Sequence, residues 1–148
     1  MHNVQRSVLV PYAPARMFEL VADVESYPDF MPWCGGAQVL ERTDDGMLAS
    51  VTISFAGLRQ SFTTRNTHDF PNSIHLTLVD GPFSRLDGHW EFQSLGDGEA
   101  CKVVFTMEYA FAGRALELLV GPVFNRIATT FIDAFSQRAE RLYGGAIS

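Results

Sequence analysis

Alternation of apolar and polar side chains dominates this sequence from Ala37 to Phe111. A period of two is the pattern of a β-strand with one buried face. Turn-forming segments divide the run, and the first of them, Asp44-Asp45-Gly46, is typical of a hairpin. Such short loops join antiparallel neighbours. With an alternating segment near the start of the chain, the pattern predicts seven antiparallel strands, over 3–10, 37–43, 47–55, 59–69, 74–79, 86–95 and 100–111.

Apolar residues recur at helical spacing on both sides of this strand region. A short helix is predicted over 14–24, with Pro14 in a favourable first position, and a single helical turn follows and stops before Pro32. The last element is predicted to be a long amphipathic helix that crosses the whole molecule. This order predicts an α+β grip within one domain, residues 1–148, in which a curved seven-stranded antiparallel sheet wraps around a long C-terminal helix.

Gly121-Pro122 interrupts the predicted last helix. An interior proline costs about 3 kcal/mol, and a glycine costs about 1 kcal/mol relative to alanine. We therefore expect the helix to begin at Pro122 or to be kinked there. Both an ordinary bend and a mobile gate beside Val120 are compatible with this dipeptide.

A strongly curved sheet touches a straight helix only along a line, so large side chains must fill the space beside it or leave a cavity. Phe62 is the ambiguous member of the predicted inner face, because Thr64, Asn66 and His68 share its side of the strand. We favour a solvent-facing position for these three polar residues; the alternative is the polar end of a pocket. The other inner-face candidates are Phe55, Leu76, Leu78, Trp90, Phe92, Phe105, Met107, Tyr109 and Phe111.

Charge and composition exclude several classes of protein. The chain has 11 basic and 17 acidic side chains and a net charge of −6, which argues against a broad nucleic-acid-binding surface and against simple attraction to anionic membranes. No run of 18 apolar residues and no signal-peptide pattern is present, so a cytoplasmic protein with Cys34 and Cys101 reduced is expected. Common catalytic motifs are absent, which favours a non-enzymatic protein without a cofactor. The scattered histidines do not predict a metal site.

Several segments carry a family resemblance that spans nearly the whole chain. The segment Phe18-Glu19-Leu20-Val21-Ala22-Asp23-Val24-Glu25-Ser26-Tyr27-Pro28-Asp29-Phe30-Met31-Pro32-Trp33-Cys34 resembles the signature of the coenzyme Q-binding protein and ribosome association toxin branch of the START-like, or helix-grip, superfamily. Gly81-Pro82-Phe83, Leu86-Asp87-Gly88-His89-Trp90-Glu91-Phe92 and the segment 134–144 are similar to it as well.

The resemblance implies binding of ubiquinone or another polyisoprenoid lipid in a central cavity, in support of respiration. For bacterial members it also implies binding to the large ribosomal subunit and a block of subunit joining. Polyketide cyclase-like catalysis is a third and weaker implication. We favour the lipid carrier, with transient contact at the inner face of the membrane, and keep the ribosome-binding translation inhibitor as the alternative.

Candidate site residues follow from these two hypotheses. The ligand-binding candidates are the aromatic and apolar residues of the predicted rim, inner face and gate: Tyr27, Phe30, Met31, Trp33, Phe62, Trp90, Phe105, Tyr109, Val120, Val123, Phe124, Ile127 and Phe131. The candidates for ribosome contact are the cationic residues in and before the last helix: Arg114, Arg126, Arg138 and Arg141.

Overall fold

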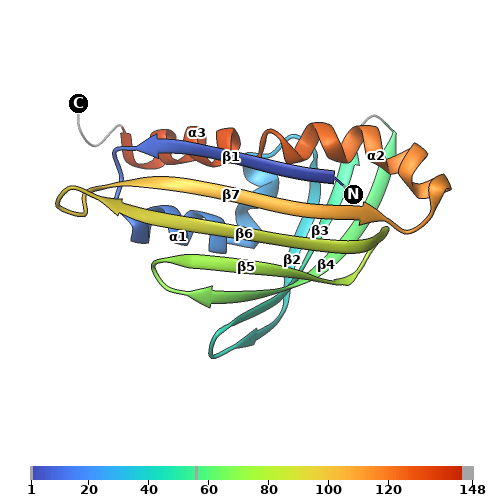
Figure 1. The fold of residues 1–148 in the computed structure, drawn as a ribbon, viewed down its shortest axis with the longest axis horizontal. Helices are drawn as coiled ribbons and strands as arrows, with labels where there is room; N and C mark the ends of the chain where they lie inside the picture. The colour runs from blue at the N-terminus through green and yellow to red at the C-terminus, as the bar shows by residue number, and fades with distance from the viewer. Residues whose placement is uncertain (1, 56, 145–148) are drawn as a thin grey trace.

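The computed structural model describes residues 2–55 and 57–144, and it contains the predicted sheet. Seven strands pair in the order β1-β7-β6-β5-β4-β3-β2, and every neighbouring pair is antiparallel (Figure 1). The strands are β1 (His2–Val10), β2 (Cys34–Thr43), β3 (Gly46–Phe55), β4 (Leu58–Asp69), β5 (Ser73–Asp80), β6 (Phe83–Leu95) and β7 (Ala100–Phe111).

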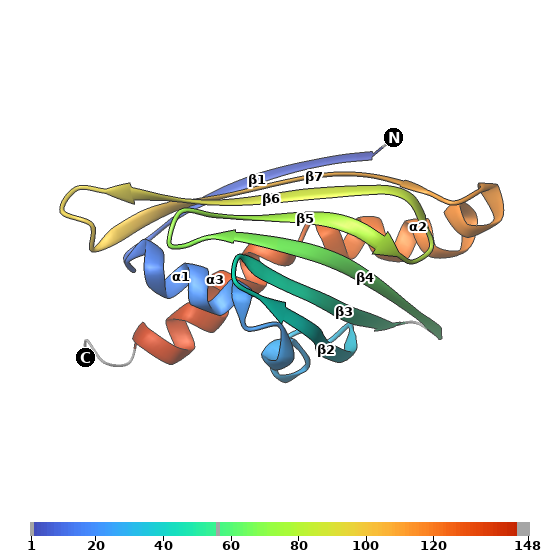
Figure 2. The same ribbon diagram turned by 90° about the horizontal axis from the view of Figure 1, so that it is seen from below.

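The helices lie together on one side of the curved sheet (Figure 2). The first of them, α1 (Pro14–Ala22), begins at the predicted proline and contacts β6, and the 3-10 helix η1 (Val24–Asp29) follows it. At the C-terminal end, α2 (Arg114–Ala128) contacts β7 and α3 (Phe131–Tyr143) contacts β1 and α1. The predicted α+β grip is therefore confirmed. Both cysteines are free and buried.

The position of the helix break differs from the prediction. Helix α2 continues through Gly121 and Pro122, so the last helix does not begin at Pro122; Pro122 is exposed. The helix ends at Ala128, and α3 leaves at an angle of 41°. The side chains of Thr129 and Thr130 donate hydrogen bonds to the carbonyls of Arg126 and Ile127, at 2.9 and 2.8 Å. Threonine hydroxyls at these positions replace the hydrogen bonds of a continued helix.

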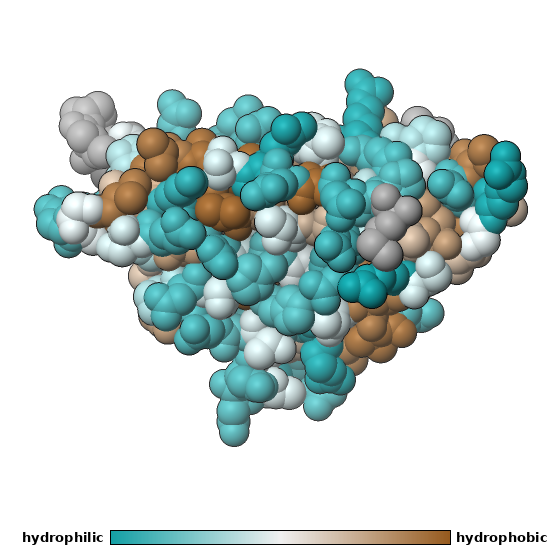
Figure 3. Space-filling model, in the orientation of Figure 1, coloured by the Kyte–Doolittle hydropathy of each residue, from teal (hydrophilic) through white to brown (hydrophobic). Residues whose placement is uncertain are grey.

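Exposed leucines occur at the end of the molecule formed by α2. Leu118 and Leu119 are 67% and 61% exposed, and hydrophobic colour is visible at this end of the surface in Figure 3. Among the described residues, no single helix is long and apolar enough to cross a membrane, and α2 and α3 meet that length and composition only when joined across their bend.

Candidate functional site

A small apolar cavity lies between the inner face of the sheet and the segment formed by η1 and α3. Its volume is about 60 Å³, which corresponds to about two water molecules. Aromatic side chains enclose most of it, so the space beside the helix is largely filled. The lining residues are Val24, Tyr27, Met31, Trp33, Ala49, Val51, Phe62, Thr64, Asn66, Leu76, Leu86, Trp90, Phe105, Met107, Phe131 and Phe135.

Many of the predicted ligand-binding residues meet at this cavity, although they come from distant parts of the sequence. Trp90 and Phe105 are cross-strand partners, with ring centroids 4.4 Å apart. Phe131 packs against both Trp33 and Phe105, at 5.5 and 5.6 Å. The predicted residues at the cavity are Tyr27, Met31, Trp33, Phe62, Trp90, Phe105 and Phe131.

The remaining ligand-binding candidates lie elsewhere. Val120 and Phe124 lie on the buried face of α2, and Tyr109 of β7 packs against them, with its ring 4.8 Å from that of Phe124. Val123 is partly buried against the same core, and Phe30 and Ile127 line surface grooves. The buried face of α2 packs against aromatic side chains of β6 and β7 as part of the core.

Thr64 and Asn66 correct the sequence prediction for β4. They are only 7% and 6% exposed and line the cavity, so the favoured solvent-facing position is wrong. Their positions in the strand place them on the same face as Phe62, which also lines the cavity. The Thr64 hydroxyl donates a hydrogen bond of 2.6 Å to the Asn66 side-chain oxygen. For these two residues the structure supports the alternative, the polar end of a pocket, which their shared face with Phe62 had left open.

His68, the third polar residue on that face, lies beyond the cavity. Its ring packs edge-on against Phe18 at 5.4 Å, and its Nε2 atom is buried without a hydrogen-bond partner among the described residues. Burial, together with the positive charge of Arg42, lowers the pKa of His68. The neutral ring is consistent with its apolar surroundings.

Among the described residues that line the cavity, Tyr27 is the one with a titratable side chain. Its hydroxyl donates a hydrogen bond to the carbonyl of Val21. Burial, reinforced by the nearby carboxylate of Asp23, strongly raises the pKa of Tyr27. The phenol therefore stays protonated near neutral pH.

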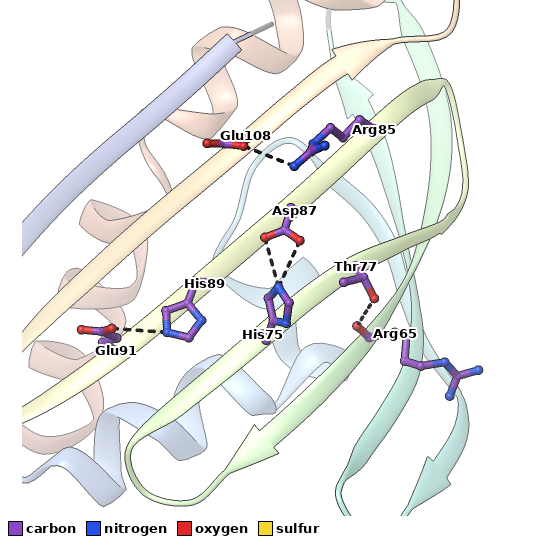
Figure 4. Close-up of polar contacts among 8 residues, drawn as sticks. All are labelled: Arg65, His75, Thr77, Arg85, Asp87, His89, Glu91 and Glu108. Carbon is purple, nitrogen blue, oxygen red and sulfur yellow. Dashed lines mark hydrogen bonds and ion pairs between the residues drawn. The ribbon is translucent and has the colours of Figure 1, made fainter.

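Charged side chains of β5, β6 and β7 gather on the opposite, outer face of the sheet, as Figure 4 shows. His75 Nε2 lies 3.0 and 3.1 Å from the two carboxylate oxygens of Asp87, and His89 Nε2 lies 3.4 Å from Glu91. Glu108 pairs with Arg85 at 3.5 Å on this face. Within the described residues, no group of three or more His, Cys, Asp or Glu side chains is arranged to hold a metal ion.

Two surface grooves flank the segment from Phe30 to Pro32, and three of the predicted arginines line them. A groove of about 420 Å³ includes Arg138 and Arg141, and another of about 430 Å³ includes Arg126. The Arg138 guanidinium lies 5.0 Å from the centre of the Phe30 ring. Asp29 shares the first groove and Asp133 the second, so the local charge is mixed.

Arg114, the fourth predicted arginine, is separate from these grooves. It is exposed at the first residue of α2. The grooves therefore bring together three of the four cations, and all three come from α2 and α3.

The chain is similar over most of its length to a known protein family and to named proteins. Residues 10–136 match the family described as "Polyketide cyclase / dehydrase and lipid transport". The "Ribosome association toxin RatA" of Pseudomonas aeruginosa is 44% identical over 96% of this chain and 98% of its own length. The mitochondrial "Coenzyme Q-binding protein coq10" of Schizosaccharomyces pombe is 29% identical over 90% of this chain and 84% of its own length.

Solved structures share the fold. The Zhui aromatase/cyclase from Streptomyces sp. R1128 has a TM-score of 0.82 at 20% identity, covering 95% of this chain and 94% of that protein. A START superfamily protein from Mycobacterium smegmatis has a TM-score of 0.73 at 22% identity, covering 96% and 99%. These similarities confirm the predicted START-like fold.

Proposed function

Since the chain belongs to the polyketide cyclase / dehydrase and lipid transport family and has the START-like fold, we propose that it associates with the ribosome as an inhibitor of translation. The observation that carries this proposal is the 44% identity to the ribosome association toxin of Pseudomonas aeruginosa, which extends over almost the full length of both proteins. The alternative hypothesis from the sequence thus has stronger support than ubiquinone transport. Such a role implies a cytoplasmic location.

The arginine-lined grooves are the surface that we propose for ribosome contact. Arginine forms forked hydrogen bonds with phosphate, and Arg126 and Arg141 are exposed in the grooves. With a net charge of −6, the protein would be attracted to RNA through this local surface rather than through its overall field. Binding at the large subunit would block joining of the two subunits by occupying the contact area.

Co-sedimentation with purified large ribosomal subunits tests this proposal. We expect the wild-type protein to co-sediment at low salt and to lose affinity as salt rises, because phosphate contacts release counterions. The double variant Arg126→Gln/Arg141→Gln should bind less, whereas Arg65→Gln should not, because Arg65 is exposed on β4 outside both grooves. No co-sedimentation of the wild-type protein, or equal loss in both variants, would contradict the proposal.

Binding of a hydrophobic ligand is a second candidate function. It is supported by the aromatic cavity and by the relative named for coenzyme Q binding. In this proposal the chain carries an isoprenoid lipid such as ubiquinone and performs no catalysis. A ligand needs far more than 60 Å³, so α3 and the rings of Phe131 and Phe135 would have to move outward.

Mass spectrometry of organic extracts from the purified protein tests the second candidate. We expect a retained isoprenoid lipid, or saturable binding of added quinone. Co-flotation with vesicles would test membrane contact, with Leu118→Ser/Leu119→Ser expected to reduce it because these leucines form an exposed apolar end. Extracts without lipid, combined with no binding of added quinone, would refute the carrier role.

A further inference from the structure

The cavity contains a pair of polar side chains where an apolar pair would pack. Thr64 is paired across strands with Ala49 and Leu78, and Asn66 with Met47 and Leu76. Both polar residues are almost completely buried. Burying an amide or hydroxyl is unfavourable unless its hydrogen bonds are replaced. On this inner face, the polar atoms of Thr64 and Asn66 therefore need hydrogen-bond partners.

The hydrogen bonds of this pair are incomplete. The Thr64 hydroxyl donates to the Asn66 Oδ1 atom at 2.6 Å, which fixes the orientation of the amide. The Asn66 Nδ2 atom carries two further N–H donors. Within the described part of the chain no side-chain hydrogen bond from Nδ2 is present, and Nδ2 is not one of the fully buried polar atoms without a partner, so it remains accessible. Because Asn66 borders the cavity, this accessible donor can serve a hydrogen-bond acceptor placed there.

No charged side chain accompanies this donor. Tyr27, the one described lining residue with a titratable group, already donates its hydroxyl proton to the Val21 carbonyl. The nearby histidines and carboxylates His75, Asp87, His89 and Glu91 lie on the outer face of the sheet (Figure 4). A carboxylate or phosphate placed in the cavity would therefore remain an uncompensated buried charge, which is strongly unfavourable.

We infer that Asn66, oriented by Thr64, anchors the head of a neutral lipid through a hydrogen-bond-accepting oxygen, such as a carbonyl or ether, and that the cavity rejects anionic lipids. This inference rests on the second proposed function. Two residues of β4 would thus select a neutral lipid head, and the aromatic residues would contact the rest of the ligand.

Three probes of similar tail length separate the contributions to binding. They are a short-tail ubiquinone analogue, a hydrocarbon without oxygen and a carboxylic acid. Both tryptophans of the chain, Trp33 and Trp90, line the cavity, so quenching of their fluorescence reports occupancy. The wild-type protein should bind the quinone more tightly than the hydrocarbon, and the ionised acid least.

Variants of the polar pair test the assignment directly. Asn66→Leu has nearly the same size and removes the donor, so it should weaken quinone binding by about five- to ten-fold and leave hydrocarbon binding unchanged. Thr64→Val releases the amide and should have a smaller effect in the same direction. Thr67→Val is the matched control, because Thr67 is exposed and lies on the other face of β4. Urea unfolding of each variant verifies that it folds.

The outcomes distinguish the inference from the function on which it rests. Equal quinone affinity in Asn66→Leu and in the wild-type protein would overturn the role of Asn66 while the carrier function stood. Tighter binding of the acid than of the quinone would overturn the selection of neutral lipids. If the folded wild-type protein bound none of the probes, both the carrier function and this inference would fail.

Discussion

The two ends of the inner face contain the same kinds of residue but pack differently. Under α2, the rings of Phe83, Tyr109 and Phe124 are buried, and the centroid of Phe124 lies 4.8 Å from each of the other two. Under α3, Trp90 and Phe105 are also buried, but the cavity remains beside them. The difference lies opposite the rings, where Ala49 and the polar pair of β4 occupy the sheet. An aromatic inner face is therefore not by itself evidence of a ligand site.

The strongest test of this comparison is Phe124→Ala. Phe124, on the inner face of α2, is completely buried, and such truncations cost about 3–5 kcal/mol. Phe131→Ala under α3 should cost less, about 1–2 kcal/mol, because Phe131 is only partly buried and already borders the cavity. Urea unfolding measures both. Equal losses would mean that the two ends are packed alike.

A smaller effect is expected from Gly46→Ala at the first residue of β3. A Cβ atom at Gly46 would lie 1.8 Å from the carbonyl oxygen of Asn66, so the strands must shift at a cost of about 1–3 kcal/mol. In the control Gly121→Ala, the new Cβ atom would lie 3.5 Å from the Phe111 ring, an ordinary contact, and the helix should gain about 0.5–1 kcal/mol. Chemical denaturation should show a lower free energy of unfolding for Gly46→Ala and a higher one for Gly121→Ala. Loss of stability in both variants would contradict the expectation that a Cβ atom has room at Gly121 but not at Gly46.

Tyr109→Phe tests a polar contact at the packed end. The Tyr109 hydroxyl donates to the Asn125 side-chain oxygen, so its removal should cost about 1 kcal/mol at pH 7. Burial raises the pKa of Tyr109 to about 12, from about 10 in the unfolded chain. The unfolded state therefore releases this proton first, and wild-type stability falls as the pH rises from about 10 to 12.

The phenylalanine variant lacks that contribution, so its deficit should shrink at alkaline pH. Urea unfolding at pH 7 and pH 11 measures the change. A deficit that is constant or larger at pH 11 would contradict burial of the neutral phenol.

The smallest effect is expected from Ala49→Val at the cavity. Because Ala49 lines the cavity, we expect its two additional methyl groups to be accommodated there and the free energy of unfolding to change by less than about 1 kcal/mol. Val120→Ile at the packed end adds a single methyl group where the side chain is 0% exposed, and should be more destabilising. Thermal unfolding compares the two. A larger loss in the valine variant would show that the cavity cannot accept more volume.

The strands and the pairing of successive strands β2 to β7 were predictable from the sequence because alternation and short loops are local signals, whereas the pairing of β1 with β7 joins distant parts of the chain and was not predicted. The same alternation places Thr64 and Asn66 with Phe62, but it does not say whether a mixed face is inside or outside. The break at Thr129–Thr130 was missed for a related reason: Gly121-Pro122 carries the stronger local signal, yet Pro122 lies on the exposed side of α2. The location of the cavity depends on the shapes of residues that are distant in sequence, such as Ala49 and Phe131.

The joint between α2 and α3 has a mechanical consequence. The threonine hydroxyls donate to the carbonyls of Arg126 and Ile127, and the Thr130 backbone N–H donates to Ile127 at 3.0 Å, so a change of angle there would act on these local hydrogen bonds rather than on those inside either helix. Swinging α3 about this pivot would enlarge or shrink the enclosed volume while the aromatic cluster under α2 kept its arrangement. The packed α2 end would thus stay fixed while α3 moves and changes the volume of the cavity.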